Sequence, residues 1–116
     1  MNPYFGNEAA RAAGARHGIA TEAWAPIARG RIAQDSTIAE IADRVGRTPA
    51  QVTLRWHLQR GDIVFPKSTH RERMEENFAL FDFELGDDDL AAISALDQGE
   101  SGRTGPNPNT FDHMSR

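Results

Sequence analysis

The pattern of hydrophobic positions along the chain predicts helices that are separated by short strands. Ile38, Ile41 and Val45 recur at helical spacing, whereas residues 63–65 form a short apolar run that is typical of a buried strand. The expected helices span residues 7–17, 36–45, 49–60, 70–80 and 87–96. The expected extended segments are 18–25, 62–65 and 81–85, and residues 1–5 are either a strand end or a loop. This order indicates an α/β protein.

Local signals set the expected helix ends. A Thr followed three residues later by Glu or Gln is typical of a capping box. The pattern occurs at Thr37–Glu40, where Asp35 is an alternative cap, and at Thr48–Gln51 and Thr69–Glu72; Asn7 is expected to cap the first helix. Inside the helices, we expect Trp56 to be a core residue and Met74 and Phe78 to face inward. Residues from Gly99 onward are rich in Gly, Pro, Asn and Ser, which predicts a tail or flexible loop.

The number of strands is too small for a complete parallel sheet. Strands that alternate with helices pair in parallel through right-handed crossovers, and parallel sheets are normally covered on both faces. We therefore expect this chain to form part of a larger sheet or barrel. Open sheet edges also favour association, so self-association through them is a further expectation.

One stretch, residues 65–77, has the outline of an anion site. A strand leads through a tight turn into a helix, and a free helix N-terminus presents N–H groups and partial positive charge to a phosphate. Lys67, the only lysine in the chain, and Ser68 lie in the turn, and Arg73 follows one helical turn later. The alternative interpretation is a surface helix whose charges are simply solvated.

Composition excludes several classes of protein. A net charge of −4 over 116 residues argues against binding to nucleic acid or an anionic membrane. The chain has no cysteine, which fits a reducing cytoplasm, and it has no long apolar run and no signal-peptide pattern. The histidines at positions 17, 57, 70 and 113 lack metal-ligand spacing, and His57 is expected in helix packing or on the surface. We expect no metal site, and Asp87–Asp89 is interpreted as an acidic helix start.

The motifs together resemble the C-terminal part of the aldo-keto reductases, in particular bacterial members similar to 2,5-diketo-gluconate reductase. The markers are Asn-Pro-Tyr-Phe at 2–5, Glu-Ala-Trp-Ala-Pro-Ile at 22–27, Thr-Pro-Ala-Gln-Val at 48–52, Leu-Arg-Trp-His-Leu-Gln-Arg-Gly at 54–61, Pro-Lys-Ser at 66–68 and Arg-Met-Glu-Glu-Asn at 73–77. The resemblance implies a (β/α)8 TIM barrel, which needs about 250 residues. Residues 1–98 would be its C-terminal part, incomplete in this chain, and residues 99–116 a C-terminal loop or tail.

The resemblance also implies a role for individual residues in binding NADP(H). Lys67, Ser68 and Arg73 would hold the 2′-phosphate, and Glu76 and Asn77 would approach the adenine. The remaining implied contacts are Trp24, which would stack on the nicotinamide, and Ile27 and Ala50, which would line the pyrophosphate and adenosine path. Ala25 stands where the family usually has a serine that bonds a phosphate oxygen.

Catalytic residues are expected to be missing. The family reduces aldehydes and ketones with an Asp, a Tyr, a Lys and a His that lie in the N-terminal half of the barrel. Tyr4 is the only tyrosine, and Lys67 is already assigned to the phosphate, so this chain has no lysine left to activate a tyrosine. The expectation is an NADP-dependent oxidoreductase present as a partial chain that is inactive alone. The alternative is a non-catalytic NADP(H)-binding or interaction fragment that folds by association.

Overall fold

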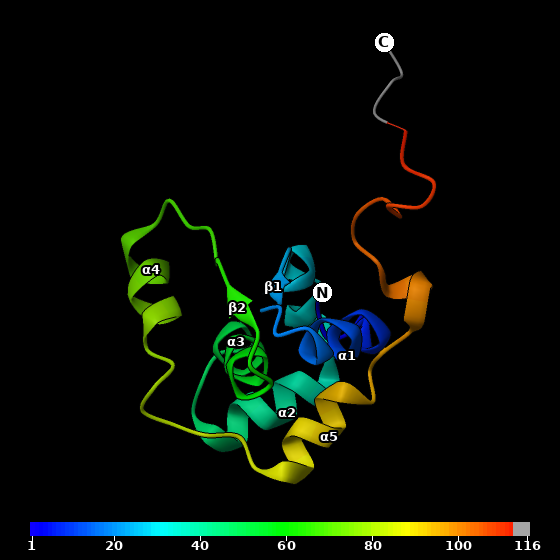
Figure 1. The fold of residues 1–116 in the computed structure, drawn as a ribbon. Helices are drawn as coiled ribbons and strands as arrows, with labels where there is room; N and C mark the ends of the chain where they lie inside the picture. Colours follow the sequence, from blue (N-terminus) through cyan, green and yellow to red (C-terminus); the bar gives the residue numbers. More distant parts are fainter. Residues whose placement is uncertain (113–116) are drawn as a thin grey trace.

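The computed structural model describes residues 1–112, and it arranges helices around one central helix beside a two-stranded sheet (Figure 1). The elements in chain order are α1 (Glu8–Arg16), β1 (Glu22–Ala23), the 3-10 helix η1 (Ala28–Gln34), α2 (Ser36–Val45), α3 (Pro49–Gln59), β2 (Ile63–Val64), α4 (Arg71–Phe78), α5 (Asp87–Ser94) and the 3-10 helix η2 (Gly99–Gly102). The alternation of helix and strand that the sequence predicts is confirmed. None of the helices in residues 1–112 is long and apolar enough to cross a membrane.

The core lies between α3 and its neighbours α2, α5 and η1. Trp56 of α3 is buried, as expected, and its indole nitrogen donates to the hydroxyl of Ser94 at 3.1 Å. The buried cluster consists of Tyr4, Ala28, Ile32, Ile38, Ile41, Ala42, Val52, Trp56, Leu85 and Ile93. Because these residues come from both ends of the chain, the helices form one packed body rather than separate hairpins.

The helix caps agree only in part with the sequence. The capping box at Thr48 and Gln51 is confirmed, with both reciprocal hydrogen bonds present. At α2 the alternative is correct, because Asp35 accepts the bond from the backbone nitrogen of Ile38 at 3.2 Å. Thr69–Glu72 does not form a box, since α4 starts one residue later, with His70 at the N-cap. Asn7 stands at the N-cap of α1 in a left-handed conformation without a side-chain cap bond.

The sheet is shorter than predicted. β1 and β2 pair in parallel, with Glu22 opposite Ile63 and Ala23 opposite Val64. Residues 18–21 and 24–25 are not strand, and a 3-10 helix begins at Ala28. Among the described residues the sheet has only these two strands, so each strand has a neighbour on one side only. The ladder is short because a strand edge without a neighbour forms no inter-strand hydrogen bonds.

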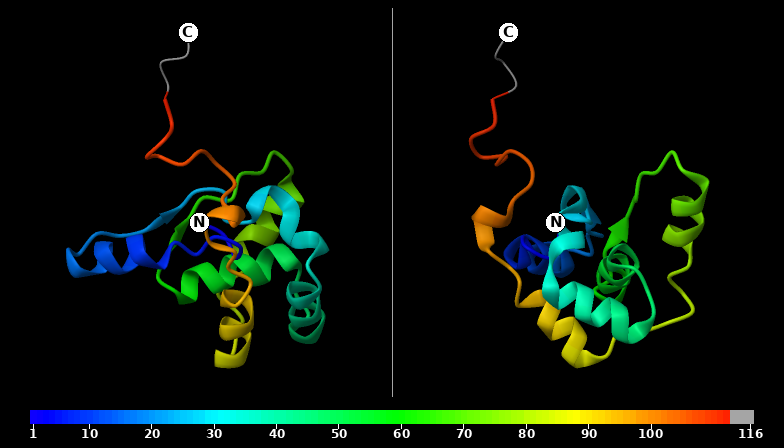
Figure 2. Two further views of the ribbon diagram at one scale, coloured as in Figure 1. Left: turned by 90° about the vertical axis from the view of Figure 1, so that its right-hand side faces the viewer. Right: turned by 180° about the vertical axis from the view of Figure 1, so that it is seen from behind.

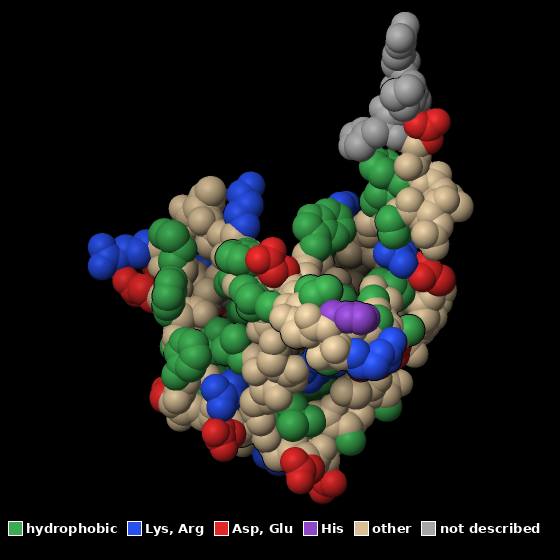
Figure 3. Space-filling model, viewed as in Figure 1, with side chains coloured by type: hydrophobic (Ala, Val, Ile, Leu, Met, Phe, Trp, Pro, Cys, Tyr) green, Lys and Arg blue, Asp and Glu red, His purple; other side chains and the backbone are tan. Residues whose placement is uncertain are grey.

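α4 projects away from the core, and the expectation that Met74 and Phe78 face inward is wrong. Figures 1 and 2 show this helix held out on two long connections, one from β2 and one to α5. Met74 is 43% exposed and Phe78 is 80% exposed. Figure 3 shows hydrophobic side chains gathered on this side of the molecule. The apolar spacing of α4 predicts a packing face, but among residues 1–112 this helix has no buried residue.

The two terminal segments meet. Residues 2–5 form a tight turn in which the backbone of Asn2 and Phe5 exchange hydrogen bonds of 3.1 and 2.9 Å. Gly102 packs directly on this turn, where a Cβ atom would lie 1.7 Å from the backbone oxygen of Tyr4. The start of the expected tail is therefore packed structure, which corrects the sequence interpretation for residues 99–102. The part of the predicted tail at 113–116 lies outside the described residues.

Candidate functional site

A groove of about 570 Å³ opens beyond the ends of the two strands. Its lining residues are Glu22, Ala23, Trp24, Ala25, Pro26, Ile27, Arg29, Phe65, Pro66 and Lys67. We call it the strand-end groove. Trp24 is 59% exposed there, and the Arg29 guanidinium lies 5.3 Å from the centre of its indole ring. An exposed aromatic face beside cations suits a flat, anionic ligand.

The loop that forms one wall of this groove has an unusual backbone. Ala25, Ala28 and Arg29 have φ angles of 52°, 48° and 56°, in the left-handed region that side chains with a Cβ rarely adopt. Two local hydrogen bonds hold the shape, from the backbone nitrogen of Ala28 to the oxygen of Ala25 and from that of Gly30 to the oxygen of Ile27, each 2.9 Å. Such a conformation persists only when its surroundings fix it.

A second, larger groove lies beside α4 and shares Lys67 with the first. Its volume is about 760 Å³, and we call it the α4 groove. It is lined by Leu58, Asp62, Ile63, Val64, Phe65, Pro66, Lys67, Ser68, Met74, Asn77, Phe78, Leu80 and Phe81. Ser68 bonds the backbone of His70 at both nitrogen and oxygen, at 3.1 and 3.2 Å, which fixes the turn before the helix. Lys67 thus lines both grooves, and Ser68 lines the α4 groove.

The structure brings together some of the residues implicated by the sequence. Trp24, Ile27 and Lys67 line the strand-end groove, and Lys67, Ser68 and Asn77 line the α4 groove. Glu76 is held at the start of α3, near Ala50, because its carboxylate accepts a bond from the hydroxyl of Thr48. Arg73 is exposed on α4 and lies outside both grooves.

A buried polar cluster behind the strand-end groove was not anticipated as a unit. His57 and Asp62 are fully buried in their side chains, and Nδ1 of His57 lies 2.8 Å from Oδ2 of Asp62. The other ring nitrogen lies 3.1 Å from the backbone oxygen of Pro26, in the groove wall. Arg11 donates to the second carboxylate oxygen at 3.0 Å. Burial opposes ionisation of Asp62, but the bonds from His57 and Arg11 hold its pKa below the usual value.

The sequence signal for this cluster was present but weak. A histidine near the end of an apolar helix, five residues before an aspartate that opens a strand, is compatible with a surface pair. Only the packing of Pro26 against the helix identifies His57 as buried.

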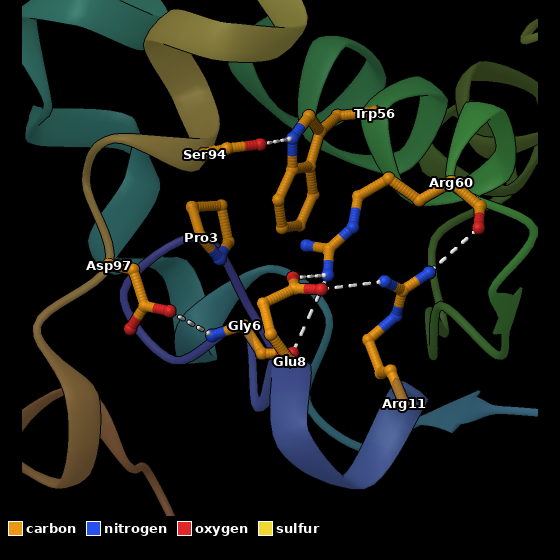
Figure 4. A pocket seen from close by; sticks show the side chains of 8 residues that line it. All are labelled: Pro3, Gly6, Glu8, Arg11, Trp56, Arg60, Ser94 and Asp97. Carbon is orange, nitrogen blue, oxygen red and sulfur yellow. Dashed lines mark hydrogen bonds and ion pairs between the residues drawn. The ribbon is translucent and has the colours of Figure 1, made fainter. Parts of the chain in front are cut away.

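A third pocket, of about 290 Å³, is closed by its own charges (Figure 4). The Arg60 guanidinium lies 4.0 Å from the centre of the Trp56 ring and pairs with Glu8. Arg11 bonds the same carboxylate at 3.0 Å, and Asp97 accepts from the backbone of Gly6 at 3.3 Å. Because these cations and carboxylates already pair with one another, we interpret the pocket as a structural joint between α1, α3 and the segment after α5.

Tyr4 lies outside both grooves. The Tyr4 hydroxyl donates to Asp35 at 3.0 Å, and burial together with this bond raises the pKa of Tyr4 to about 12. That pKa is far from the range useful for proton transfer at neutral pH. Within residues 1–112, no group of three or more His, Cys, Asp or Glu side chains is arranged to hold a metal.

Comparison with known sequences identifies relatives over nearly the whole chain. The sequence model of the Aldo/keto reductase family matches residues 2–98. An aldo-keto reductase of Mycolicibacterium smegmatis is 46% identical over 112 residues, which cover 97% of this chain and 40% of that protein. The methylglyoxal reductase DkgA of Salmonella typhimurium is 43% identical, over 96% of this chain and 40% of its own length. This chain therefore spans about 40% of the length of these relatives.

Solved structures give the same result. A mutant of Gox0644 in complex with NADPH superposes with a TM-score of 0.93 and 45% identity, covering 97% of this chain and 41% of that one. A putative 2,5-diketo-D-gluconic acid reductase B superposes with a TM-score of 0.87 and 36% identity, covering 93% and 38%. The chain belongs to the aldo-keto reductase family, and its fold is part of that family's (β/α)8 barrel.

Proposed function

We propose that this chain carries the NADP(H)-binding part of an aldo-keto reductase, with the adenosine 2′-phosphate held by Lys67, Ser68 and Arg73. The observation that carries the proposal is the joining of the two grooves at Lys67, beside the turn that opens α4. An extended dinucleotide needs such a continuous surface, with an aromatic wall at one end and a cation at the other.

The remaining assignments follow the same path. Trp24 stacks on the nicotinamide, Ile27 and Ala50 line the pyrophosphate and adenosine path, and Glu76 and Asn77 approach the adenine. The exposure of Trp24 and the proximity of Glu76 to the start of α3 support this arrangement. The NADPH complex of the related Gox0644 mutant supports the choice of cofactor.

The whole activity is the reduction of an aldehyde or ketone by hydride transfer, and this chain alone is inactive in our proposal. It has one tyrosine and one lysine, and Tyr4 is engaged with Asp35. An N-terminal half of the barrel supplies the catalytic Asp, Tyr, Lys and His and most of the substrate pocket. We place the protein in the cytoplasm, with no nucleic-acid or membrane partner.

The decisive experiment is a tryptophan-fluorescence titration of the chain with NADPH and with NADH, with circular dichroism as a check on folding. Trp24 is exposed in the groove and Trp56 is buried, so quenching reports mainly on the proposed site. Saturable quenching that is stronger with NADPH supports the proposal. A folded chain with no quenching by either cofactor contradicts it. Carbonyl reduction by the chain alone would contradict the proposal that this chain lacks the catalytic residues.

The second candidate is an interaction fragment that folds by association. Its support is the exposed apolar surface along β2 and α4, where Phe65 is 66% and Phe78 is 80% exposed. Exposed apolar side chains that cluster on one surface mark interaction sites. Sedimentation of the chain over a range of concentrations separates the candidates, because self-association through the sheet edge predicts a mass that rises with concentration, whether or not NADPH binds.

A further inference from the structure

We propose that His57, as an imidazolium buried between Asp62 and the Pro26 carbonyl, is a positioning residue that holds the groove loop 24–30 in its ligand-binding shape. The inference rests on the proposed function for its ligand, NADP(H), and goes beyond it by assigning a role to a residue that does not line the groove.

The first step is the hydrogen-bond geometry at the ring. Nδ1 faces a carboxylate oxygen at 2.8 Å, and Nε2 faces a backbone carbonyl oxygen at 3.1 Å. A carbonyl only accepts, and so does an ionised carboxylate. Both bonds therefore form together only when both ring nitrogens carry hydrogen.

The second step is the charge around the ring. Asp62 is kept ionised by Arg11, whose Nε donates at 3.0 Å to the carboxylate oxygen that His57 does not use. Arg11 is itself fixed by a 2.7 Å bond from Nη2 to the backbone oxygen of Arg60. The charged groups that act on Asp62 are thus His57, Arg11, Arg60 and the amino group of Met1. Asp62 therefore stays ionised, and both of its oxygens act only as acceptors.

The third step links the ring to the groove. Pro26 lies between Ala25 and Ile27, and all three line the strand-end groove. The loop around them holds three non-glycine residues at positive φ, a conformation that needs an external restraint. The bond from the fully buried His57 ties the middle of this loop to α3. Without this bond, only the two local hydrogen bonds from Ala28 and Gly30 would hold the loop.

The spectroscopic test uses the wild-type chain without cofactor. Long-range proton–nitrogen NMR of the ¹⁵N-labelled chain at neutral pH distinguishes an imidazolium from either neutral tautomer, and His57→Gln assigns the signal. We expect His57 to show both nitrogens protonated. A neutral-tautomer pattern for His57 overturns the proposal.

The functional test compares three variants by NADPH titration and amide exchange. His57→Gln should raise the Kd for NADPH about tenfold, the effect of losing one hydrogen bond from a charged donor. In the same variant, the amides of Ala28 and Gly30 should exchange faster. His17→Gln, at the exposed end of α1, is the matched control and should change neither quantity.

Asp62→Asn separates positioning from simple packing. The new amide can donate to Nδ1 while a neutral His57 still donates from Nε2 to Pro26, so the tether survives without the charge. We expect the imidazolium signature to disappear while the amides of Ala28 and Gly30 exchange as slowly as in wild type. Equal protection of Ala28 and Gly30 in wild type and His57→Gln overturns the proposal. If the wild-type chain does not bind NADPH, the proposed function fails, and the exchange comparison still decides the role of His57.

Discussion

The side-chain nitrogen of Gln51 lies 3.2 Å from the backbone oxygen of Glu76 and 3.2 Å from that of Ala79. Through these two bonds the start of α3 holds the end of α4, while the oxygen of the same amide accepts from the backbone of Thr48 at 3.1 Å. One buried residue therefore caps one helix and anchors another. This anchor sets where Glu76 and Asn77 stand relative to Ala50.

Replacing Gln51 with alanine tests that anchor. We expect Gln51→Ala to lower the free energy of unfolding by about 2 kcal/mol, because it removes half of the capping box and the side-chain donor to the carbonyls of Glu76 and Ala79. Urea denaturation measures the loss, and hydrogen exchange should show faster opening of α4. Gln34→Ala, at an exposed position ending η1, is the control and should stay near wild type. An α4 that exchanges as slowly as before would contradict the anchoring role.

Lys67 and Arg73 should favour NADPH over NADH by binding the 2′-phosphate. Lys67→Ala combined with Arg73→Ala is expected to weaken NADPH binding by about a hundredfold, because each removed contact to a phosphate is worth about 1.5 kcal/mol. NADH binding should change little, since it lacks that phosphate. Paired fluorescence titrations check this. Equal losses for the two cofactors would show that these residues do not distinguish them. Arg71→Ala, which removes an exposed arginine already paired with Glu75 at 2.8 Å, serves as the control for loss of a single positive charge on α4.

Asp62 should make the stability of the chain depend on pH in the acid range. Its pKa is lowered in the folded state from an ordinary value of 3.8, despite burial, by the bonds from His57 and Arg11. The folded state thus binds this proton less readily than the unfolded chain. The stabilisation is fully present above the ordinary pKa and is lost as the pH falls through the lowered folded value.

Urea denaturation at a series of pH values from about 6 down to about 3 measures this dependence. Wild type should lose stability steeply on acidification. Asp62→Asn should start less stable, because Arg11 loses its charged partner, and should show a flatter slope. Parallel slopes in the two proteins would mean that other carboxylates account for the acid sensitivity.

Gly102 should tolerate no side chain. A Cβ atom there would meet the backbone oxygen of Tyr4 at 1.7 Å, so Gly102→Ala must push η2 off the turn at residues 2–5. We expect the free energy of unfolding to fall by about 2 kcal/mol, as is usual for an overpacked core position. The segment that follows Gln98 should also be cleaved faster by proteases. Gly86→Ala, where the nearest atom would be 4.0 Å away, is the control. Unchanged thermal unfolding of Gly102→Ala would contradict the close packing of the two terminal segments.

The amino-acid sequence determined those features that depend on neighbouring residues. The Thr48–Gln51 box, the apolar faces of α2 and α3 and the turn carrying Lys67 and Ser68 are each encoded within a few positions, because caps and periodicity act through short-range hydrogen bonds and burial. The family motifs, also read from the sequence alone, gave the barrel and its reductase family, and the comparisons confirm both.

Only the tertiary structure decided the features that join distant segments. His57 meets Pro26 across 31 positions, and the exposure of Phe78 depends on which elements stand opposite α4. The left-handed backbone of the loop at Ala25 and Ala28 contradicts local preference, so no local pattern in the sequence predicts it. Local patterns determine which segments form helices. Contacts between buried polar groups form only when those helices pack together, because the partners are far apart in the sequence.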